Sequence, residues 1–168
     1  VCDDKLVDVL VETGRLLSEQ GIGLDIYGSI DKNYDDNNLF KKMISGIENV
    51  NYKGSYDGFA SLPVNDYDMF LLTSKNEGMP FVVLEACAAN IFVVAPTVGG
   101  IPETIKDGKN GALVGNKFSP KSYAHAIMDA YKVNSYTDKE NIESQNKIVD
   151  KRHSKSTYSN SVKRLMEL

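Results

Sequence analysis

The sequence predicts an α/β fold, a doubly wound parallel sheet of the Rossmann-like kind, covered by helices on both faces. Short apolar stretches of strand length alternate with helical patterns along the 168 residues, which is typical of a parallel sheet. Most of the apolar stretches end in glycine or serine, as at Gly28, Gly54 and Ser74. No internal repeat, low-complexity tract or linker interrupts this alternation, so we expect a single domain.

The first part of the chain predicts two helices and two strands. Apolar residues recur at helical spacing over residues 5–20, and Gly21 is a natural stop. Residues 23–28 and 50–54 predict short strands that close on glycine. Between them, residues 37–48 predict an amphipathic helix, with an inward face of Leu39, Phe40, Met43, Ile44 and Ile47.

The second part of the chain continues the same alternation. Residues 67–72, 92–96 and 111–114 predict strands, and residues 81–89 and 119–133 predict helices. The second of these helices has a clear start signal, because a serine suited to the N-cap precedes a proline at the first helical position.

The two ends of the chain differ from this pattern. The final thirty residues predict a polar helix with a thin apolar stripe of Ile142, Ile148, Val162, Leu165 and Met166. At the other end, the helix over residues 5–20 has no strand before it, although a doubly wound sheet normally begins with one. We therefore expect residues 1–168 to be a single domain, truncated at its N-terminal edge, of a longer protein.

Composition excludes several classes of function. Hydrophobic residues make up 42% and charged residues 25%, as in ordinary globular proteins, and a net charge of −4 argues against nucleic acid as a partner. The two cysteines, Cys2 and Cys87, suggest neither a disulfide framework nor a zinc site, so a reducing cytoplasm is expected. His125 and His153 belong to no ligand cluster, so no metal site is predicted. This composition is also compatible with a peripheral contact between the protein and a membrane.

The loop before the helix at residues 81–89 is a candidate anion site. Pro80 suits the first turn of that helix, which would leave the peptide N–H groups of Met79, Phe81 and Val82 unpaired. Such groups, together with the helix dipole, favour an anion or a hydroxyl acceptor. Gly78 would let the backbone approach a ligand closely.

Two glutamates, Glu77 and Glu85, bracket this stretch. Glu85 lies on a helix with almost no other polar residue, so no solvated face is evident for it, and a buried carboxylate needs partners. The vicinal hydroxyls of a sugar would be suitable partners. Alternatively, Glu77 is an acid that the helix dipole stabilises, and Glu85 is exposed or paired with a lysine. Gly99 and Gly100 suggest a structural turn.

Residues 73–114, "TSKNEGMPFVVLEACAANIFVVAPTVGGIPETIKDGKNGALV", resemble the donor-binding segment of retaining glycosyltransferases of family 4 (glycosyl transferases group 1), which have the GT-B fold. The resemblance extends over nearly all the chain up to about residue 135. The residues that match the family pattern are Ser74, Glu77, Gly78, Pro80, Glu85, Gly99, Gly100, Glu103, Asp107, Gly108, Gly111, Leu113 and Val114.

The resemblance implies a role for each candidate residue. Glu77 would be the catalytic residue on this chain, near the hydroxyls of the donor sugar, and Glu85 would bind the ribose. The backbone of residues 78–82 would meet the sugar and the phosphates. Lys5 would neutralise the pyrophosphate leaving group, and Tyr56 would line the base pocket. Asn90 stands where the family has glycine, and it can adopt the same left-handed conformation.

The resemblance also implies the activity. This chain would be the C-terminal half of a GT-B enzyme that moves a sugar from a nucleotide-diphospho-sugar, such as a UDP-sugar, to an acceptor hydroxyl with retention. No cofactor and no metal are implied. The glycan or lipid-linked acceptor would bind an N-terminal domain that is absent here, so this chain would bind the donor weakly and be inactive alone. We expect the enzyme in the cytoplasm, with the inner face of the membrane as an alternative. A GT-B nucleotide-sugar epimerase and a degenerate, binding-only module remain rival interpretations.

Overall fold

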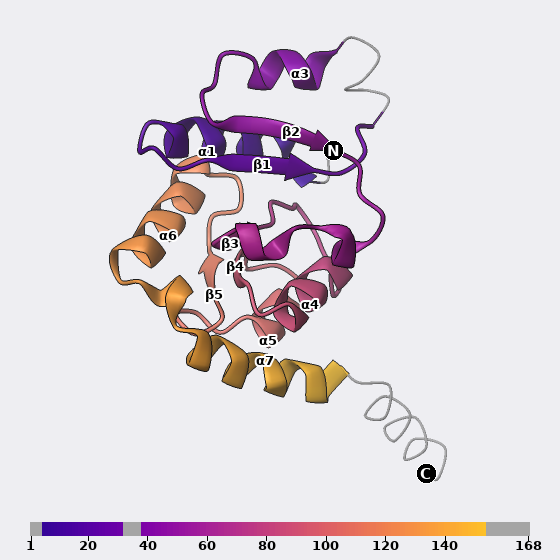
Figure 1. Ribbon diagram of the computed structural model, residues 1–168, viewed down its shortest axis with the longest axis vertical. Coiled ribbons are helices and arrows are strands. Elements are labelled where there is room, and N and C mark those ends of the chain that lie inside the picture. Colours follow the sequence, from indigo (N-terminus) through magenta and orange to yellow (C-terminus); the bar gives the residue numbers. More distant parts are fainter. Residues whose placement is uncertain (1–4, 32–37, 154–168) are drawn as a thin grey trace.

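The computed structural model describes residues 5–31 and 38–153, and its elements follow the predicted order (Figure 1). They are α1 (Val7–Ser18), β1 (Leu24–Tyr27), α3 (Leu39–Ile44), β2 (Val50–Gly54), the 3₁₀ helices η2 (Phe59–Ser61) and η3 (Val64–Asp66), β3 (Met69–Leu71), α4 (Phe81–Ala88), β4 (Phe92–Pro96), α5 (Ile101–Thr104), β5 (Gly111–Val114), α6 (Pro120–Lys132), η4 (Ser135–Thr137) and α7 (Lys139–His153). Cys2, Val162, Leu165 and Met166 lie outside the described residues.

The strands form two parallel sheets instead of the single sheet that the sequence predicts. β1 pairs with β2 in one sheet, and the order in the other is β3-β4-β5. The α/β class and the parallel arrangement are therefore confirmed. The sheets are separate because no strand of the described residues pairs with both β1 and β3.

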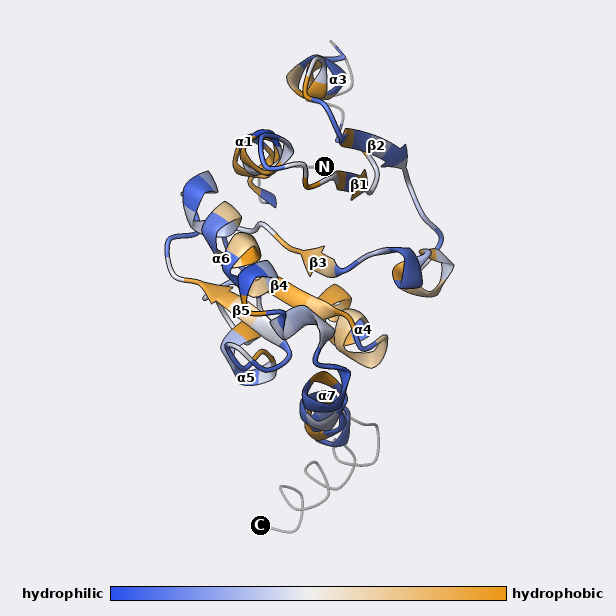
Figure 2. Cartoon of the chain, turned by 60° about the vertical axis from the view of Figure 1, so that its left-hand side comes forward, coloured by the Kyte–Doolittle hydropathy of each residue, from blue (hydrophilic) through white to orange (hydrophobic). Residues whose placement is uncertain are grey.

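β4 is the centre of the three-stranded sheet, and all five of its residues are buried. Its side chains alternate between two cores, as the period of a strand requires. Phe92 and Val94 pack into a core that includes residues of α1 and α6, and Val93 and Ala95 pack into a core that includes residues of α4 and α5. The predicted cover of helices on both faces is thus confirmed for this sheet, and Figure 2 shows β4 as a continuous hydrophobic strand.

The two-stranded sheet has a smaller core. Ile26 of β1 and Val50 of β2 pack with residues of α1 and with Phe40 of α3. α3 is shorter than the predicted helix over residues 37–48, because the backbone becomes extended at Ser45 and turns at a glycine of positive φ. The prediction that Leu39 points inward is wrong, since this first residue of the helix is 43% exposed.

α7 packs on the three-stranded region through a face that is partly polar. Ile142, Asn146 and Val149 are buried, at the spacing of four and three residues that one helix face requires. Ile148 lies off this face and is 46% exposed, so its predicted place in the apolar stripe is wrong. Asn146 accepts a hydrogen bond from Nδ2 of buried Asn110 (2.9 Å), which ties the helix to the core.

Several signals at the ends of elements are confirmed. The hydroxyl of Ser119 accepts a hydrogen bond from the amide of Ser122 (3.3 Å) and caps α6. Asn90, which follows α4, has a φ of 56°, so it performs the conformational task of a glycine. Among the helices of residues 5–31 and 38–153, none is long and apolar enough to cross a membrane.

Candidate functional site

Two predicted site residues, Lys5 and Glu77, meet beyond the carboxyl end of β3. The Nζ of Lys5 forms an ion pair with Oε1 of Glu77, although 72 positions separate them in the sequence. The side chain of Glu77 is 13% exposed and that of Lys5 is 42% exposed, so the ammonium group stays open to solvent. Buried Thr73, two residues after β3, donates a hydrogen bond to the carbonyl of Lys5 (2.6 Å) and holds the start of α1 in place.

The loop after β3 rests on the two glycines that follow β4. The amide of Gly100 donates a hydrogen bond to the carbonyl of Gly78 (2.6 Å). A Cβ atom on Gly99 would lie 1.8 Å from the carbonyl oxygen of Glu77, and one on Gly100 would lie 2.6 Å from Cε of Met79. Gly99 therefore does more than form the structural turn that the sequence suggests, since its neighbour is backbone and only a residue without a side chain lets the Glu77 loop pack here. At Gly100 the neighbour is the end of the flexible Met79 side chain, which would shift.

The start of α4 presents unpaired amides beside this loop. Pro80 is its N-cap residue, and no side chain caps the helix. Within the described residues, no protein acceptor is bonded to the amide of Phe81 or of Val82. Met79 turns away from this surface, because its sulfur accepts a hydrogen bond from Thr104 of α5 (3.4 Å). These amides are free hydrogen-bond donors, and the helix dipole adds partial positive charge at the same place. Both features favour the binding of an anion.

Glu85 lies on a solvated face of α4. Phe81, one turn earlier, is 80% exposed, and Glu85 and Ala88 are exposed with it. The expectation that this helix has no solvated face is therefore wrong. Within the described residues, no hydrogen bond or ion pair holds the Glu85 carboxylate, and its role toward a sugar stays a prediction.

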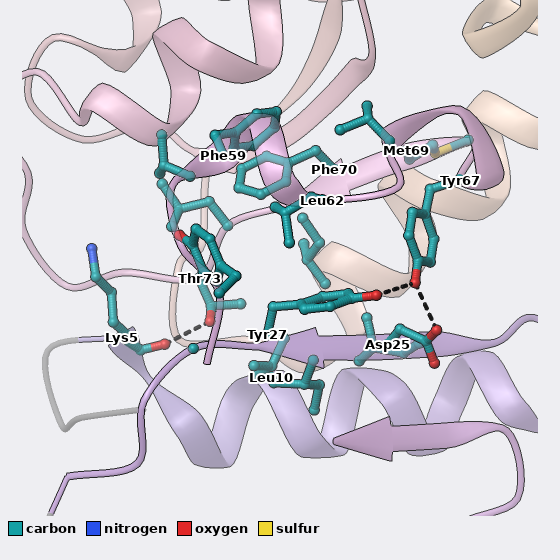
Figure 3. Close-up of a pocket in the computed structure, with 18 of the residues that line it drawn as sticks. Lys5, Leu10, Asp25, Tyr27, Phe59, Leu62, Tyr67, Met69, Phe70 and Thr73 are labelled. Atoms are coloured by element: carbon teal, nitrogen blue, oxygen red, sulfur yellow. Dashed lines mark hydrogen bonds between the residues drawn. The ribbon is translucent and has the colours of Figure 1, made fainter. Parts of the chain in front are cut away.

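A cavity of about 750 Å³ lies between β1 and β3 (Figure 3). Three predicted site residues line it, namely Lys5, Tyr56 and Val82, whereas Glu77 and Glu85 do not. Tyr56 is 39% exposed, and its ring meets the ring of Tyr27 edge to face at a centroid distance of 6.5 Å. The end of β1 and the loop after β2 thus bring aromatic rings to the same cavity as the lysine.

A chain of hydroxyl groups crosses this cavity. Tyr67 donates a hydrogen bond to Oδ2 of Asp25 (2.8 Å), and the hydroxyls of Tyr27 and Tyr67 lie 2.8 Å apart. Because Tyr67 gives its single hydroxyl hydrogen to Asp25, Tyr27 must be the donor to Tyr67. Partial burial raises the pKa of Asp25, but hydrogen bonds from Asn51, Tyr67 and Lys53 outweigh burial and lower this pKa below its ordinary value.

Sequence reasoning missed several residues of this region. Thr73, Tyr27 and Tyr67 escaped notice. Tyr27 lies within the predicted strand at residues 23–28, Tyr67 begins the predicted strand at residues 67–72, and Thr73 follows it. Ser74, which the family pattern includes, is fully buried, and its hydroxyl donates to the carbonyl of Asn76 (3.3 Å). This buried serine therefore stabilises the conformation of the loop and is not exposed to contact a ligand. In the described part of the chain, no group of three or more His, Cys, Asp or Glu residues is placed to hold a metal ion.

Comparison with known proteins identifies the family. The family model "Glycosyl transferases group 1" matches residues 2–132. The colanic acid biosynthesis glycosyltransferase WcaL of Salmonella typhimurium, a putative assignment, is 36% identical over 104 residues, which are 58% of this chain and 24% of WcaL. An uncharacterized glycosyltransferase of Methanocaldococcus jannaschii is 30% identical over 129 residues, which are 69% of this chain and 36% of that protein.

Solved structures show the same fold. HepE of Anabaena, solved in complex with UDP-glucose, matches all of this chain with a TM-score of 0.81 at 20% identity, and this chain covers 47% of it. The pneumococcal O-GlcNAc transferase GtfA, in complex with UDP and GlcNAc, gives a TM-score of 0.73 at 21% identity, with 99% of this chain and 34% of GtfA covered. The chain thus spans less than half the length of these relatives. Because the family model covers well over half of the chain, the protein belongs to the group 1 glycosyl transferases.

Proposed function

We propose that this chain is the donor-binding part of a retaining glycosyltransferase, which moves a sugar from a nucleotide-diphospho-sugar to an acceptor hydroxyl. The observation that carries the proposal is the meeting of Lys5 and Glu77 beside the open amides at the start of α4. A cation, unpaired amides and a carboxylate at the carboxyl ends of parallel strands form a site for a ligand with both phosphates and hydroxyls.

The phosphates of the donor would lie between Lys5 and the start of α4. Negative charge grows on the leaving diphosphate as the sugar departs, so groups that attract this charge lower the barrier. The ammonium group of Lys5 supplies a mobile charge, and the amides of Phe81 and Val82 supply fixed dipoles. No metal ion is needed in this proposal.

Glu77 would accept hydrogen bonds from the sugar hydroxyls and act as the catalytic residue of this chain. Its carboxylate is mostly covered and forms an ion pair with Lys5. When the donor binds, the sugar hydroxyls must therefore either join Lys5 at the carboxylate or replace it. Glu85 would bind the ribose, and the ring of Tyr56 would contact the base. UDP is the first nucleotide to test, because solved relatives of the same fold hold UDP or UDP-glucose.

The acceptor, a glycan or a lipid-linked saccharide, would bind another domain of the full-length protein. In this proposal the enzyme acts in the cytoplasm or at the inner face of the membrane. The chain of residues 1–168 alone would bind the donor weakly and transfer no sugar, because one side of the reaction site is missing.

Isothermal titration calorimetry of the 168-residue chain with UDP, GDP, UDP-glucose and GDP-mannose tests the proposal. We expect one nucleotide class to bind and Glu85→Ala to weaken it by about 1–3 kcal/mol, the effect of losing a charged hydrogen-bond partner. Glu143→Ala is the matched control, because this exposed glutamate lies on α7. The proposal fails if neither this chain nor the full-length protein binds a nucleotide, or if the two variants bind equally well.

A further inference from the structure

Hydrogen bonds hold the backbone of the loop between β3 and α4, which carries Glu77, on both sides of this residue. The hydroxyl of Ser74 donates to the carbonyl of Asn76, just before Glu77 (3.3 Å). The amide of Gly100 donates to the carbonyl of Gly78, just after it (2.6 Å). The place of the Glu77 carboxylate therefore depends on contacts that its neighbours in the loop make.

Lys117 makes a further contact with this loop, from the other end of the three-stranded sheet. It lies between β5 and α6, it is partly buried, and its ammonium group donates a hydrogen bond to the carbonyl of Lys75. Lys75 is two positions before Glu77 and 42 positions before Lys117. Because the donor is charged, such a bond is stronger than one between two neutral groups. The β5–α6 loop thus holds the Glu77 loop through a side chain.

The segment that carries Lys117 is itself held by hydrogen bonds. The side chain of Asn116 accepts a hydrogen bond from the amide of Phe118 (3.3 Å), and the carbonyl of Asn116 accepts one from the amide of Ser119 (3.1 Å). Ser119 is the N-cap residue of α6. The ammonium group of Lys117 also lies 5.3 Å from the centroid of the Phe118 ring, within the range of a cation–π contact. Lys117 therefore starts from a fixed position.

The Glu77 carboxylate is sensitive to the position of this backbone. The side chain of Glu77 is 13% exposed and pairs with Lys5, and the carbonyl of Lys5 accepts a hydrogen bond from Thr73 in the same loop (Figure 3). A carboxylate that orients sugar hydroxyls must stay within a narrow range of positions. A shift of the backbone at Lys75 would move this carboxylate out of that range.

We propose that Lys117 is a positioning residue of the donor site, which holds the loop at Lys75 so that the Glu77 carboxylate stays in place for the hydroxyls of the donor sugar. The inference rests on the proposed function, in which Glu77 accepts hydrogen bonds from the sugar. Lys117 acts through the loop and makes no contact with the donor. Its loss should therefore weaken the contact with the sugar and leave the contacts with the nucleotide nearly unchanged.

Titrations of the 168-residue chain with UDP and with UDP-glucose, followed by two-dimensional NMR, test the inference. Lys117→Met keeps the apolar stem and removes the ammonium group. We expect it to raise the Kd for UDP-glucose at least about fivefold and the Kd for UDP less than about twofold. Lys117→Arg keeps a charged donor and should restore most of the affinity for UDP-glucose. Lys121→Met, at an exposed lysine of α6, is the matched control and should change neither Kd.

A double-mutant cycle separates positioning from direct contact. If Lys117 acts through Glu77, Lys117→Met should have no further effect on UDP-glucose binding when Glu77→Ala is already present. An effect of full size in that background, or an equal loss of affinity for UDP, would mean that Lys117 contacts the donor, and would overturn the inference. Unchanged binding of UDP-glucose by Lys117→Met would overturn it too.

The amide spectrum without ligand distinguishes a failure of this inference from a failure of the proposed function. Lys117→Met should shift the amide signals of Asn76, Glu77 and Gly78, whereas Lys121→Met should not. If these signals shift but the unaltered chain and the full-length protein bind neither UDP-glucose nor GDP-mannose, the proposed function fails and the contact of Lys117 with the loop is upheld. If a nucleotide-sugar binds and the signals do not shift, the inference fails and the proposed function is upheld.

Discussion

The region around β4 and the region around β1 have different degrees of burial. All five residues of β4 are buried, because the strand has a neighbour on each side and helices over both faces. β1 has one buried residue, Ile26, since among the described strands it pairs with β2 alone and it borders the cavity. The same kind of parallel strand is thus a core element in one region and an edge in the other.

α1 joins the two regions. Leu6, at its N-cap, and Val9 and Leu17 of α1 belong to the core that includes α6, whereas Val7 and Val11 belong to the core under β1 and β2. Lys5, just before this helix, belongs to the candidate site. Four substitutions, in decreasing order of expected effect, test this contrast between the regions.

Gly99→Ala should have the largest effect. Its φ is 53°, and its Cβ would meet the carbonyl oxygen of Glu77 at 1.8 Å, so the Glu77 loop must move. We expect a loss of about 3 kcal/mol or more in the free energy of unfolding, measured by urea denaturation. Gly21→Ala is the control, because it has a φ of 73° and nothing within 4 Å, and should lose about 1 kcal/mol. Equal losses would contradict the packing of this loop.

Asn146→Ala should have the second-largest effect on stability. The side-chain amide of Asn110, which is fully buried, donates a hydrogen bond to Asn146. The substitution removes this acceptor, so a buried polar group loses a partner. We expect about 2 kcal/mol of destabilisation, visible in thermal unfolding followed by circular dichroism. Ser144→Ala, on the exposed side of α7, should change stability by less than about 0.5 kcal/mol. A neutral Asn146→Ala variant would mean that α7 is not tied to the core in this way.

Tyr67→Phe should destabilise the protein by about 1.5 kcal/mol, because it removes two partly exposed hydrogen bonds, the one to Asp25 and the one from Tyr27. It should also raise the pKa of Asp25, because a hydrogen bond to the carboxylate is lost. In the unaltered chain these hydrogen bonds hold the pKa of Asp25 below its ordinary value, so its contribution to stability is fully present above the ordinary pKa and is lost as the pH falls through the lowered one. A carbon-13 NMR titration of the Asp25 carboxyl that gives the same midpoint in both proteins would argue against this hydrogen bond.

Tyr123→Phe should have the smallest effect on stability, and any change should be a stabilisation, unlike the three substitutions above. Tyr123 of α6 has no exposed surface, and its hydroxyl has no partner within the described residues. Burial raises the pKa of this phenol, since the charged form cannot be solvated. We expect stability to stay equal or rise by up to about 1 kcal/mol in urea denaturation. Tyr131→Phe, which loses a hydrogen bond to Asp68 (2.9 Å), is the control with the opposite expected sign.

Elements with strong local signals were predictable from the sequence. The strands at residues 50–54, 92–96 and 111–114 have the predicted bounds. Glycine closes one of them, proline ends another, and a run of apolar residues marks the strand at 92–96 as buried on both faces. The left-handed conformation of Asn90 was also predictable, because few residues adopt it readily.

Features that depend on tertiary contacts were not predictable from local pattern. The exposure of Leu39, Ile148 and Glu85 depends on which helix face meets the core. That face is ambiguous in the short α3 and α4, and in the mostly polar α7, whose buried face includes Asn146. The contact between Lys5 and Glu77 spans 72 positions, so no spacing rule indicates it. The resemblance assigned both residues to one site, but the gap between the sheets appears only in three dimensions.

A titration of the nitrogen-15-labelled chain with UDP, followed by two-dimensional NMR, tests most directly whether the Lys5–Glu77 region binds a nucleoside diphosphate. We predict that the amides of Gly78, Phe81 and Val82 shift most, that amides of α7 do not shift, and that Lys5→Ala weakens the response. Shifts confined to α7, or shifts at the start of α4 that Lys5→Ala leaves unchanged, would contradict the account.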